Sequence, residues 1–456
     1  MKTPIALGTL TLASLALACG SSETRAVPAV TPHTTPAQSA TVAPTAVTAI
    51  EEPAPKTKED ALVAKMLTRV SKQRGLAVKR PVAGKKLERA ALIGKIRDKV
   101  DKEIPPEAVT LEGDTLKLYG FVPVDMDYLD TTMKLLEAQL AGFYEPKDET
   151  MYLAGDLDGI NGDLTLAHEL EHALQDQHYD LKKHSGYRPG HGDEQAAFSG
   201  LCEGDATSVM LDMMLHKVSK SKNAFDLDDD ALEEQIAGGV EKDPSTKNIP
   251  HIMKADLASP YVYGTRFVHA LRRTGGWASV NRAFTQPPVT TEQLLHPEKW
   301  ARNEAAVRVE PPPAPGKDWK RTDDDTSGEL GLALGFAEWS TKVEGFRLAE
   351  GWGGDRDATY TQGDKLVNIM RVEYDATAPK GAEAAQTRLA QGLPKGTLRD
   401  GAFACADRPQ LGPLAFAFSG NKLLVIAGPA TRGKTWKSAA SCKDAAFRAW
   451  AKTALQ

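Results

Sequence analysis

The stretch His168-Glu169-Leu170-Glu171-His172 decides how this chain of 456 residues is interpreted. It spells H-E-x-x-H, the pattern of a helix that presents two imidazoles to one metal ion. Positions four apart lie one above the other on an α-helix, so His168 and His172 share a face. Glu169 follows at a position from which its carboxylate can take a proton from a metal-bound water. The stretch therefore predicts a zinc site on a helix, with Glu169 as its base.

The residues around the motif agree with a partly buried helix. Asp163 is a typical N-cap residue and precedes Leu164, the first apolar residue of the pattern. Side chains with metal-binding groups fall on one side of the predicted helix. Small and apolar side chains fall on the other side: Leu166, Ala167, Leu170, Ala173 and Leu174. The alternative is an ordinary amphipathic helix with two surface histidines, but this two-sided pattern favours a metal site.

A catalytic zinc ion needs a third protein ligand, because such sites combine three protein groups with a water. His178 has the spacing of the pattern H-E-x-x-H-x-x-G-x-x-H, but Gln175 stands where that pattern needs a glycine. Glu203 lies in a second predicted helix, on a face of small residues that would let two helices approach closely. The alternative for Glu203 is a surface acid on a core helix. We favour Glu203 over His178 as the third ligand.

Two segments together resemble a known family. Leu166–Leu181 contains the motif, and Leu201-Cys-Glu-Gly-Asp-Ala206 follows it. With them the chain resembles the gluzincin branch of the zincin metallopeptidases, and more closely a group of largely uncharacterised bacterial lipoproteins. The likeness covers residues 60–300 and is strengthened by two further segments, at residues 142–153 and 260–300, with residues 351–356 as an outlying match. It implies a zincin-like fold, bound Zn²⁺ and hydrolysis of peptide bonds in a peptide or protein substrate.

The resemblance also implies roles for residues outside the motif. A tetrahedral intermediate needs an oxyanion donor, and zincins of this type often use a downstream Tyr or His. Tyr263, Tyr261 and His296 are the candidates in this chain, and a structural role is the alternative for each. Asp176 or Asp205 is expected to orient one of the histidines.

A function of another class is also open. The chain could be a non-enzymatic surface lipoprotein in which the zincin-like part is a binding or structural module. The intact motif argues against this alternative, because a scaffold has no use for Glu169. Zinc content combined with a protease assay separates the two.

The N-terminus predicts export. Met1-Lys2 is a short positive start, and Ile5 to Ala18 is apolar or small. Leu15-Ala-Leu-Ala-Cys19 then resembles a bacterial lipoprotein cleavage site, so residues 1–18 are expected to be a signal peptide. Lipid on Cys19 would tether the protein to the cell envelope. Secretion with cleavage near Ala18 is the alternative.

The segment after Cys19 predicts a tether. Residues 19–58 are rich in Pro, Ala and Thr and lack the apolar content to form a core. Gly20 is not an aspartate, so the usual signal that retains enterobacterial lipoproteins in the inner membrane is absent, which favours the outer membrane.

The rest of the chain predicts an α+β fold in two domains. The first, at residues 59–310, is the zincin-like metallopeptidase domain, and the second, at 327–456, is a smaller α+β domain of unknown role. Pro311–Pro315 marks the boundary. Helices are expected at Glu59–Arg74, Lys86–Lys102, Thr132–Leu140, Glu194–Val218, Val262–Thr274, Ala278–Phe284 and Lys443–Thr453. Strands are expected at Phe143–Tyr144 and Met151–Leu153, as a hairpin, and at Lys365–Tyr374, Leu414–Ser419 and Lys422–Ala427.

The net charge and the short motifs limit the classes of ligand that the chain is expected to bind. A formal net charge of −5 argues against nucleic acid. Gly428–Thr435 spells a phosphate-binding loop, but Pro429 removes an N–H that such a loop uses. The chain also ends too soon afterwards for the parallel sheet that normally follows, so a hairpin turn is expected and no nucleotide. The acidic runs Asp226–Glu234 and Asp323–Asp325 predict solvated loops or helix faces.

Two cysteines remain as a pair that a disulfide could join. Cys202 is expected to be a small buried residue beside Glu203, which leaves Cys405 and Cys442. Export would permit a disulfide between them, but the sequence does not show that they lie close enough.

Overall fold

The computed structural model describes residues 55–156, 159–184, 186–217, 219 and 221–456. The signal peptide predicted at 1–18, the lipid site Cys19 and the tether up to residue 54 lie outside the described residues. No helix among the described residues is long and apolar enough to span a bilayer. The chain combines helices, at 53% of residues, with strands, at 18%, which places it in the α+β class.

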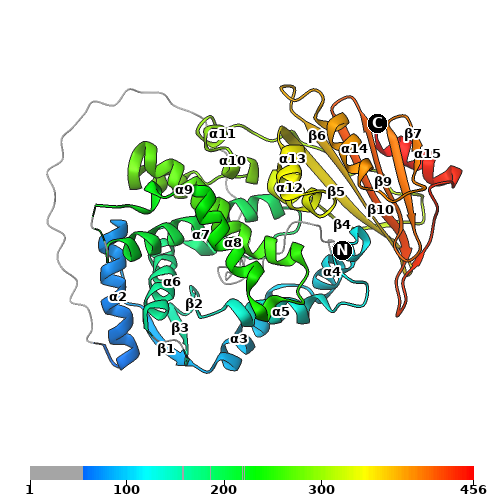
Figure 1. Ribbon diagram of the computed structural model, residues 1–456. Helices are drawn as coiled ribbons and strands as arrows, with labels where there is room; N and C mark the ends of the chain where they lie inside the picture. The colour runs from blue at the N-terminus through cyan, green and yellow to red at the C-terminus, as the bar shows by residue number, and fades with distance from the viewer. Residues whose placement is uncertain (1–54, 157–158, 185, 218, 220) are drawn as a thin grey trace, which may run out of the picture.

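The first part of the chain is mainly helical and lies beside a large sheet formed by the second part (Figure 1). Its helices are α2 (Lys58–Arg74), α3 (Arg89–Glu103), α4 (Pro106–Tyr119), α5 (Tyr128–Gln139), α6 (Gly159–Tyr179), α7 (Gly192–Leu215), α8 (Asp229–Lys242), α9 (His251–Thr285), α10 (Thr291–Leu295) and α11 (Pro297–Ala301). Three short strands, β1 (Ala83–Leu87), β2 (Gly142–Glu145) and β3 (Thr150–Ala154), form a sheet in the order β1-β3-β2. The predicted hairpin is thus confirmed, and β2 is an edge strand.

Helix α6 buries the apolar face that the sequence predicts. Leu166, Ala167, Leu170, Ala173 and Leu174 are all buried, in one core with α2 and the small sheet. The expected N-cap is wrong, because α6 already begins at Gly159 and Asp163 lies inside it.

Helices α7 and α9 approach each other unusually closely. A Cβ atom on Gly204 would lie 2.1 Å from the backbone of Gly264, and one on Gly264 would lie 1.8 Å from the carbonyl oxygen of Gly200. Glycine is therefore required at positions 204 and 264, because a side chain at either position would push the two helices apart. The small face predicted around Glu203 is where this contact forms, and it fixes α7 beside the rest of the helical part.

Helix α9 spans both of the helices predicted after Val262. The chain is kinked between them, where Gly275 and Gly276 leave helical geometry. Gly276 has φ of 60°, in the left-handed region that glycine adopts without strain. The expected break between Thr274 and Ala278 is therefore confirmed, and two helical segments of α9 meet at this kink.

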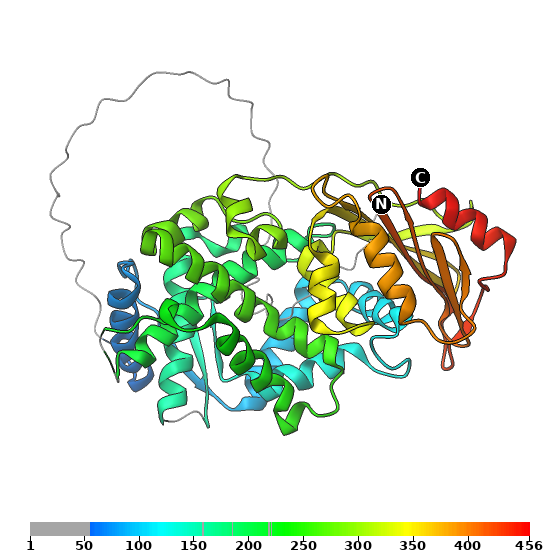
Figure 2. The ribbon, with the colours of Figure 1, turned by 45° about the horizontal axis from the view of Figure 1, so that its top comes forward.

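The second part of the chain is an antiparallel sheet with helices on both faces (Figure 2). The sheet contains β4 (Lys320–Asp325), β5 (Trp352–Gln362), β6 (Lys365–Tyr374), β7 (Leu398–Asp400), β8 (Phe403–Arg408), β9 (Gly412–Ser419), β10 (Lys422–Thr431) and β11 (Lys437–Ser438). Its main path is β4-β5-β6-β10-β9-β8-β7, and β11 pairs with β10. One face packs against α12 (Gly328–Glu338), α13 (Lys342–Ala349) and α14 (Gly381–Gln391), and the other against α15 (Ala445–Ala454).

The two parts share core residues. Leu118 and Tyr119 of α4 pack into the same core as the helix-covered face of the sheet. The sheet also begins earlier than residue 327, since β4 starts at Lys320. The part of the chain predicted as a second domain is therefore continuous with the first in its packing.

Cys405 and Cys442 form a disulfide that joins β8 to the segment before α15. Cys202 is buried and free. The segment Gly428–Thr435 continues β10 and turns back into β11, where Thr431 pairs with Lys437. This segment therefore contains the predicted hairpin turn.

The prediction of a solvated loop or helix face is confirmed for one of the two acidic runs and is wrong for the other. Asp226–Glu234 leads into α8 and is largely on its surface. Asp323–Asp325 forms the end of β4, where Asp323 is 1% and Asp325 4% exposed. The expectation of a solvated loop is wrong there, because α4 and the N-terminus of α7 cover this end of the sheet.

Candidate metal centre

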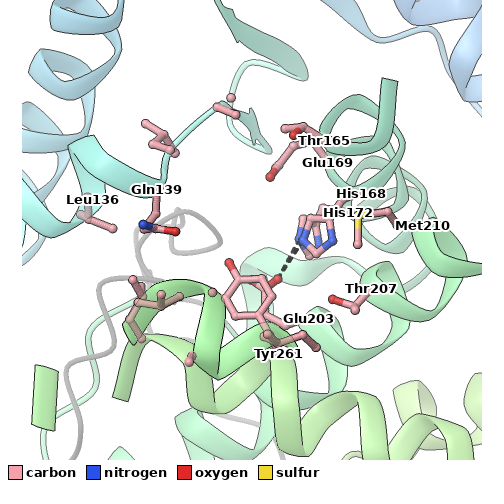
Figure 3. A pocket seen from close by; sticks show the side chains of 18 of the residues that line it. Leu136, Gln139, Thr165, His168, Glu169, His172, Glu203, Thr207, Met210 and Tyr261 are labelled. Atoms are coloured by element: carbon pink, nitrogen blue, oxygen red, sulfur yellow. Dashed lines mark hydrogen bonds and ion pairs between the residues drawn. The ribbon is translucent and has the colours of Figure 1, made fainter. Parts of the chain in front are cut away.

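Helices α6 and α7 bring two imidazoles and one carboxylate together (Figure 3). Nε2 of His168 lies 3.0 Å from Oε2 of Glu203, and Nε2 of His172 lies 3.4 Å from the same oxygen. The two Nε2 atoms are 3.2 Å apart. All three side chains are buried. The structure thus places the predicted ligands in one group.

The spacing of these three donor atoms fits a zinc ion. Ligands about 2.0–2.1 Å from a tetrahedral metal lie about 3.3 Å from one another. The observed separations are 3.0, 3.2 and 3.4 Å. Hydrogen bonds alone do not explain the contact between the two Nε2 atoms, because each nitrogen would already donate its proton to Glu203. Two histidines with one glutamate are also a donor set of catalytic zinc sites.

The electrostatics of the group favour charge on both partners. Burial would raise the pKa of Glu203, but His172 and His168 outweigh it and lower that pKa to about 2. Burial would lower the pKa of His172, but Glu203 and Glu169 raise it to about 9. The carboxylate is therefore ionised, as a metal ligand must be, whereas His172 is protonated when no metal is bound and must release the proton of Nε2 to become a ligand.

A buried polar network fixes the ring of His172. Nδ1 of His172 lies 2.9 Å from Oε1 of Gln175. The amide nitrogen of Gln175 donates to the carbonyl of Cys202 at 3.0 Å and to Asp205 at 3.1 Å. Because that nitrogen is committed, Oε1 must face the ring, and Nδ1 of His172 must carry the proton. The lone pair of Nε2 is then directed to the metal position.

The same network reaches helix α2. Nε of Arg74 donates to Asp205 at 2.7 Å, and both side chains are fully buried. The expectation that Asp205 orients a histidine is thus met only through Gln175. Asp176 does not take part, because it accepts from the hydroxyl of Tyr144 and from Arg80. The motif pattern gives Gln175 only as the residue in place of a glycine, although its position three residues after His172 on the same helical face is a signal of this role.

Glu169 lies at the edge of the group. One of its oxygens is within 4.8 Å of the ligand atoms of His168 and His172. Its Oε2 accepts the backbone N–H of Tyr144, on strand β2, at 3.1 Å. Burial raises the pKa of Glu169 above its ordinary value, and the two histidines oppose that shift. Its position suits a base for a water on the metal.

Tyr261 of α9 completes the wall. Its ring stacks on His168, with 5.8 Å between the ring centroids, and its hydroxyl interacts with Glu203. Burial raises the pKa of Tyr261 well above its ordinary value, so the phenol keeps its proton and can donate a hydrogen bond.

The other oxyanion candidates must be corrected. The hydroxyl of Tyr263 bonds Glu233 at 3.4 Å, because two positions turn a helix by about 200° and point this side chain away from Tyr261. His296 bonds Glu329 at 3.0 Å, beside α12. Neither lines the pocket around the ligands. His178, the rejected ligand, bonds the carbonyl of Ala77 at 2.7 Å.

The ligands open onto a pocket of about 380 Å³. Apolar side chains from five helices and the segment between α5 and β2 form most of its wall: Ile96, Leu136, Leu140, Ala141, Met210, Ile236, Val240, Leu257 and Ala258. A substrate would therefore reach the ligands through an apolar cavity.

Comparison of the chain with protein-family models, with curated proteins and with solved structures finds no match.

Proposed function

We propose that this chain is a zinc-dependent peptidase of the zincin type, which hydrolyses peptide bonds with Glu169 as general base. The observation that carries the proposal is the convergence of His168, His172 and Glu203 at 3.0–3.4 Å, with Glu169 beside them. The H-E-x-x-H motif and the Glu203 segment support it through their resemblance to gluzincins.

The residues of the pocket divide the work of the reaction. A zinc ion held by the three ligands would polarise the scissile carbonyl and lower the pKa of a bound water. Glu169 accepts the proton of the attacking water and delivers it to the leaving amine. The N–H of Tyr144 holds one oxygen of Glu169 in place, and the hydroxyl of Tyr261 donates to the developing oxyanion.

Location is proposed from the sequence alone. Lipid on Cys19 would anchor the enzyme in the cell envelope, on the outer membrane. Cys19→Ser should then release the protein from the membrane fraction or leave it unprocessed, because only the thiol accepts the lipid. Normal processing and unchanged membrane association of this variant would contradict the anchor.

Metal analysis and a peptidase assay on the full-length protein and Glu169→Gln test the function. The wild type should bind one zinc per chain and cleave casein or peptide mixtures. Glu169→Gln should keep the zinc and lose most of the activity, since an amide cannot accept the proton. A variant as active as wild type would refute the mechanism. Bound zinc without cleavage by either protein would instead favour a non-enzymatic module.

A further inference from the structure

The wall of the metal pocket carries little charge. Among the described residues that line it, the only carboxylates, imidazoles or basic side chains are the four of the metal centre: His168, Glu169, His172 and Glu203. The remaining lining is mainly aliphatic, and it contains no Lys or Arg within the part of the chain that the structure describes. The apolar character of this lining determines which substrate side chains can enter the pocket.

An apolar wall of this kind favours an apolar side chain. Each buried methylene group contributes about 0.8 kcal/mol, whereas a charged group buried without a partner is strongly disfavoured. The free ends of a peptide face the same penalty. An aminopeptidase binds the terminal ammonium group of its substrate and needs an acid beside it, whereas a carboxypeptidase binds a terminal carboxylate and needs a basic group. Beyond the metal centre, the described lining offers neither an acid nor a basic side chain.

Helix α8 contributes one side of the wall of the metal pocket. Ile236, Gly239 and Val240 face the metal pocket. Gly239 contributes no side chain, and a Cβ atom built there would meet nothing within 4 Å. The neighbouring Gly238 instead lines a different pocket on the other side of α8.

Ion pairs fix α8 against its neighbours. Glu233 pairs with Arg266 of α9 and with Lys342 of α13. At the other end of the helix, Lys254 of α9 donates to Glu241 at 2.8 Å. The position of Gly239 relative to the metal ligands is therefore held from both ends of the helix.

We infer that the enzyme is an endopeptidase that cleaves beside a large apolar residue, such as Leu or Phe, whose side chain enters the pocket against α8. Because Gly239 has no side chain, space remains beside α8 for the side chain of the substrate. This inference rests on the proposed peptidase function.

The test compares Gly239→Leu with Gly238→Leu in the full-length, zinc-loaded protein. Both changes replace glycine by a better helix former, so both variants should fold. The substrates are one fluorogenic peptide series, acetylated and amidated at its ends, with Phe, Leu, Ala, Lys or Asp on either side of the cleavage site.

The wild type should cleave the Leu and Phe peptides at least about 10-fold more efficiently, by kcat/KM, than the Lys and Asp peptides. Gly239→Leu should reduce kcat/KM for the Phe peptide by about 10-fold or more and change that for the Ala peptide little, because the new side chain fills the pocket. Gly238→Leu should keep the wild-type preference.

Three results would overturn the inference while leaving the peptidase intact: cleavage that requires a free terminus, equal efficiency on Lys and Leu peptides, or the same change in both glycine variants. A zinc-loaded wild type that cleaves none of the peptides and no protein substrate would refute the proposed function along with it.

Discussion

The Oε2 atom of Glu203 lies 3.0 Å from Nε2 of His168, although 35 positions separate the two residues in the chain. The contact forms where helix α6, which carries His168, packs against helix α7, which carries Glu203. Helix α7 is held against α9 through Gly204 and Gly264, and the opposite side of α6 is held by the core it shares with α2. The ligand geometry therefore depends on helix packing on both sides.

The first prediction concerns the ligands themselves. His168→Ala or His172→Ala should abolish stoichiometric zinc, and Glu203→Ala should weaken zinc binding by about 10-fold or more, because each removes one of three protein ligands. His178→Ala is the matched control and should keep full zinc, since its side chain bonds the carbonyl of Ala77. Metal analysis of purified variants checks this. Loss of zinc in the control together with normal zinc in Glu203→Ala would show that the ligand set is wrong.

The second prediction concerns the network behind His172. Gln175→Leu removes the acceptor for Nδ1, so zinc affinity should fall by about 10- to 100-fold, as is usual when such a partner is lost. Gln177→Leu is the control, because Gln177 lies two positions further along α6 and bonds the backbone of Lys79 and Arg80. Competition with a zinc chelator measures both affinities. Equal affinities in the two variants would remove Gln175 from the site.

The third prediction separates two tyrosines on one helix. Tyr261→Phe should lower kcat by roughly 10²–10³ with little change in zinc content, because it removes a donor to the oxyanion. Tyr263→Phe should leave kcat near the wild-type value, since its hydroxyl bonds Glu233 outside the pocket. Steady-state kinetics on one peptide decides between them. If only the Tyr263 variant lost activity, the assignment of the donor would be reversed.

The sequence was sufficient for the parts of the site that lie within one helix. The spacing of His168 and His172 predicts their shared face, and the apolar positions within and around the motif predict which face packs into the core. Glu203 could also be predicted, because the small residues around it indicate a close helix contact. The strand Lys365–Tyr374 has the predicted bounds, since it is an apolar run between turn signals.

The parts that depend on packing between distant elements could not be predicted. Tyr261 and Tyr263 are the same residue type on the same helix, and only the rotation of α9 against α7 decides which one faces the metal ligands. The role of Gln175 could not be predicted, because it requires Asp205 and Cys202, which belong to another helix. The acids at the end of β4 form a charged run in the sequence, which predicts exposure, but elements far away in the chain bury them.

Those buried acids carry the last prediction. Asp325 on β4 is paired in register with Asp357 on β5, and Asp323 lies on the same face. Asp357 is 0% exposed, and neither of its carboxylate oxygens has a hydrogen-bond partner among the described residues. Burial raises the pKa of Asp323 to about 9, and it raises the pKa of Asp357 well above its ordinary value, with neighbouring carboxylates adding to both shifts.

The raised pKa values fix the sign of a pH dependence. The folded chain holds these protons, whereas the unfolded chain releases them above its ordinary pKa of 3.8. The stabilisation is thus complete below 3.8 and is lost as pH rises through the folded value, about 9 for Asp323. Asp357→Asn cannot ionise, so its Tm should exceed that of wild type at pH 9 by about 2 °C or more, on the order of 1 kcal/mol for a domain of this size. The advantage should shrink toward pH 5.

Asp324→Asn is the control for this experiment, because Asp324 lies on the same strand but is paired with Arg356. It should give no gain in Tm at pH 9, since it removes an ion pair and relieves no buried charge. The measurement is thermal unfolding of the wild type and the two variants at pH 5, 7 and 9, each with excess zinc. The difference in Tm between each variant and the wild type is compared across pH, because the titration of the metal ligands affects all three proteins equally and cancels. A Tm of Asp357→Asn below that of wild type at pH 9 would mean that the carboxylate of Asp357 stabilises the fold, and the predicted direction would be wrong.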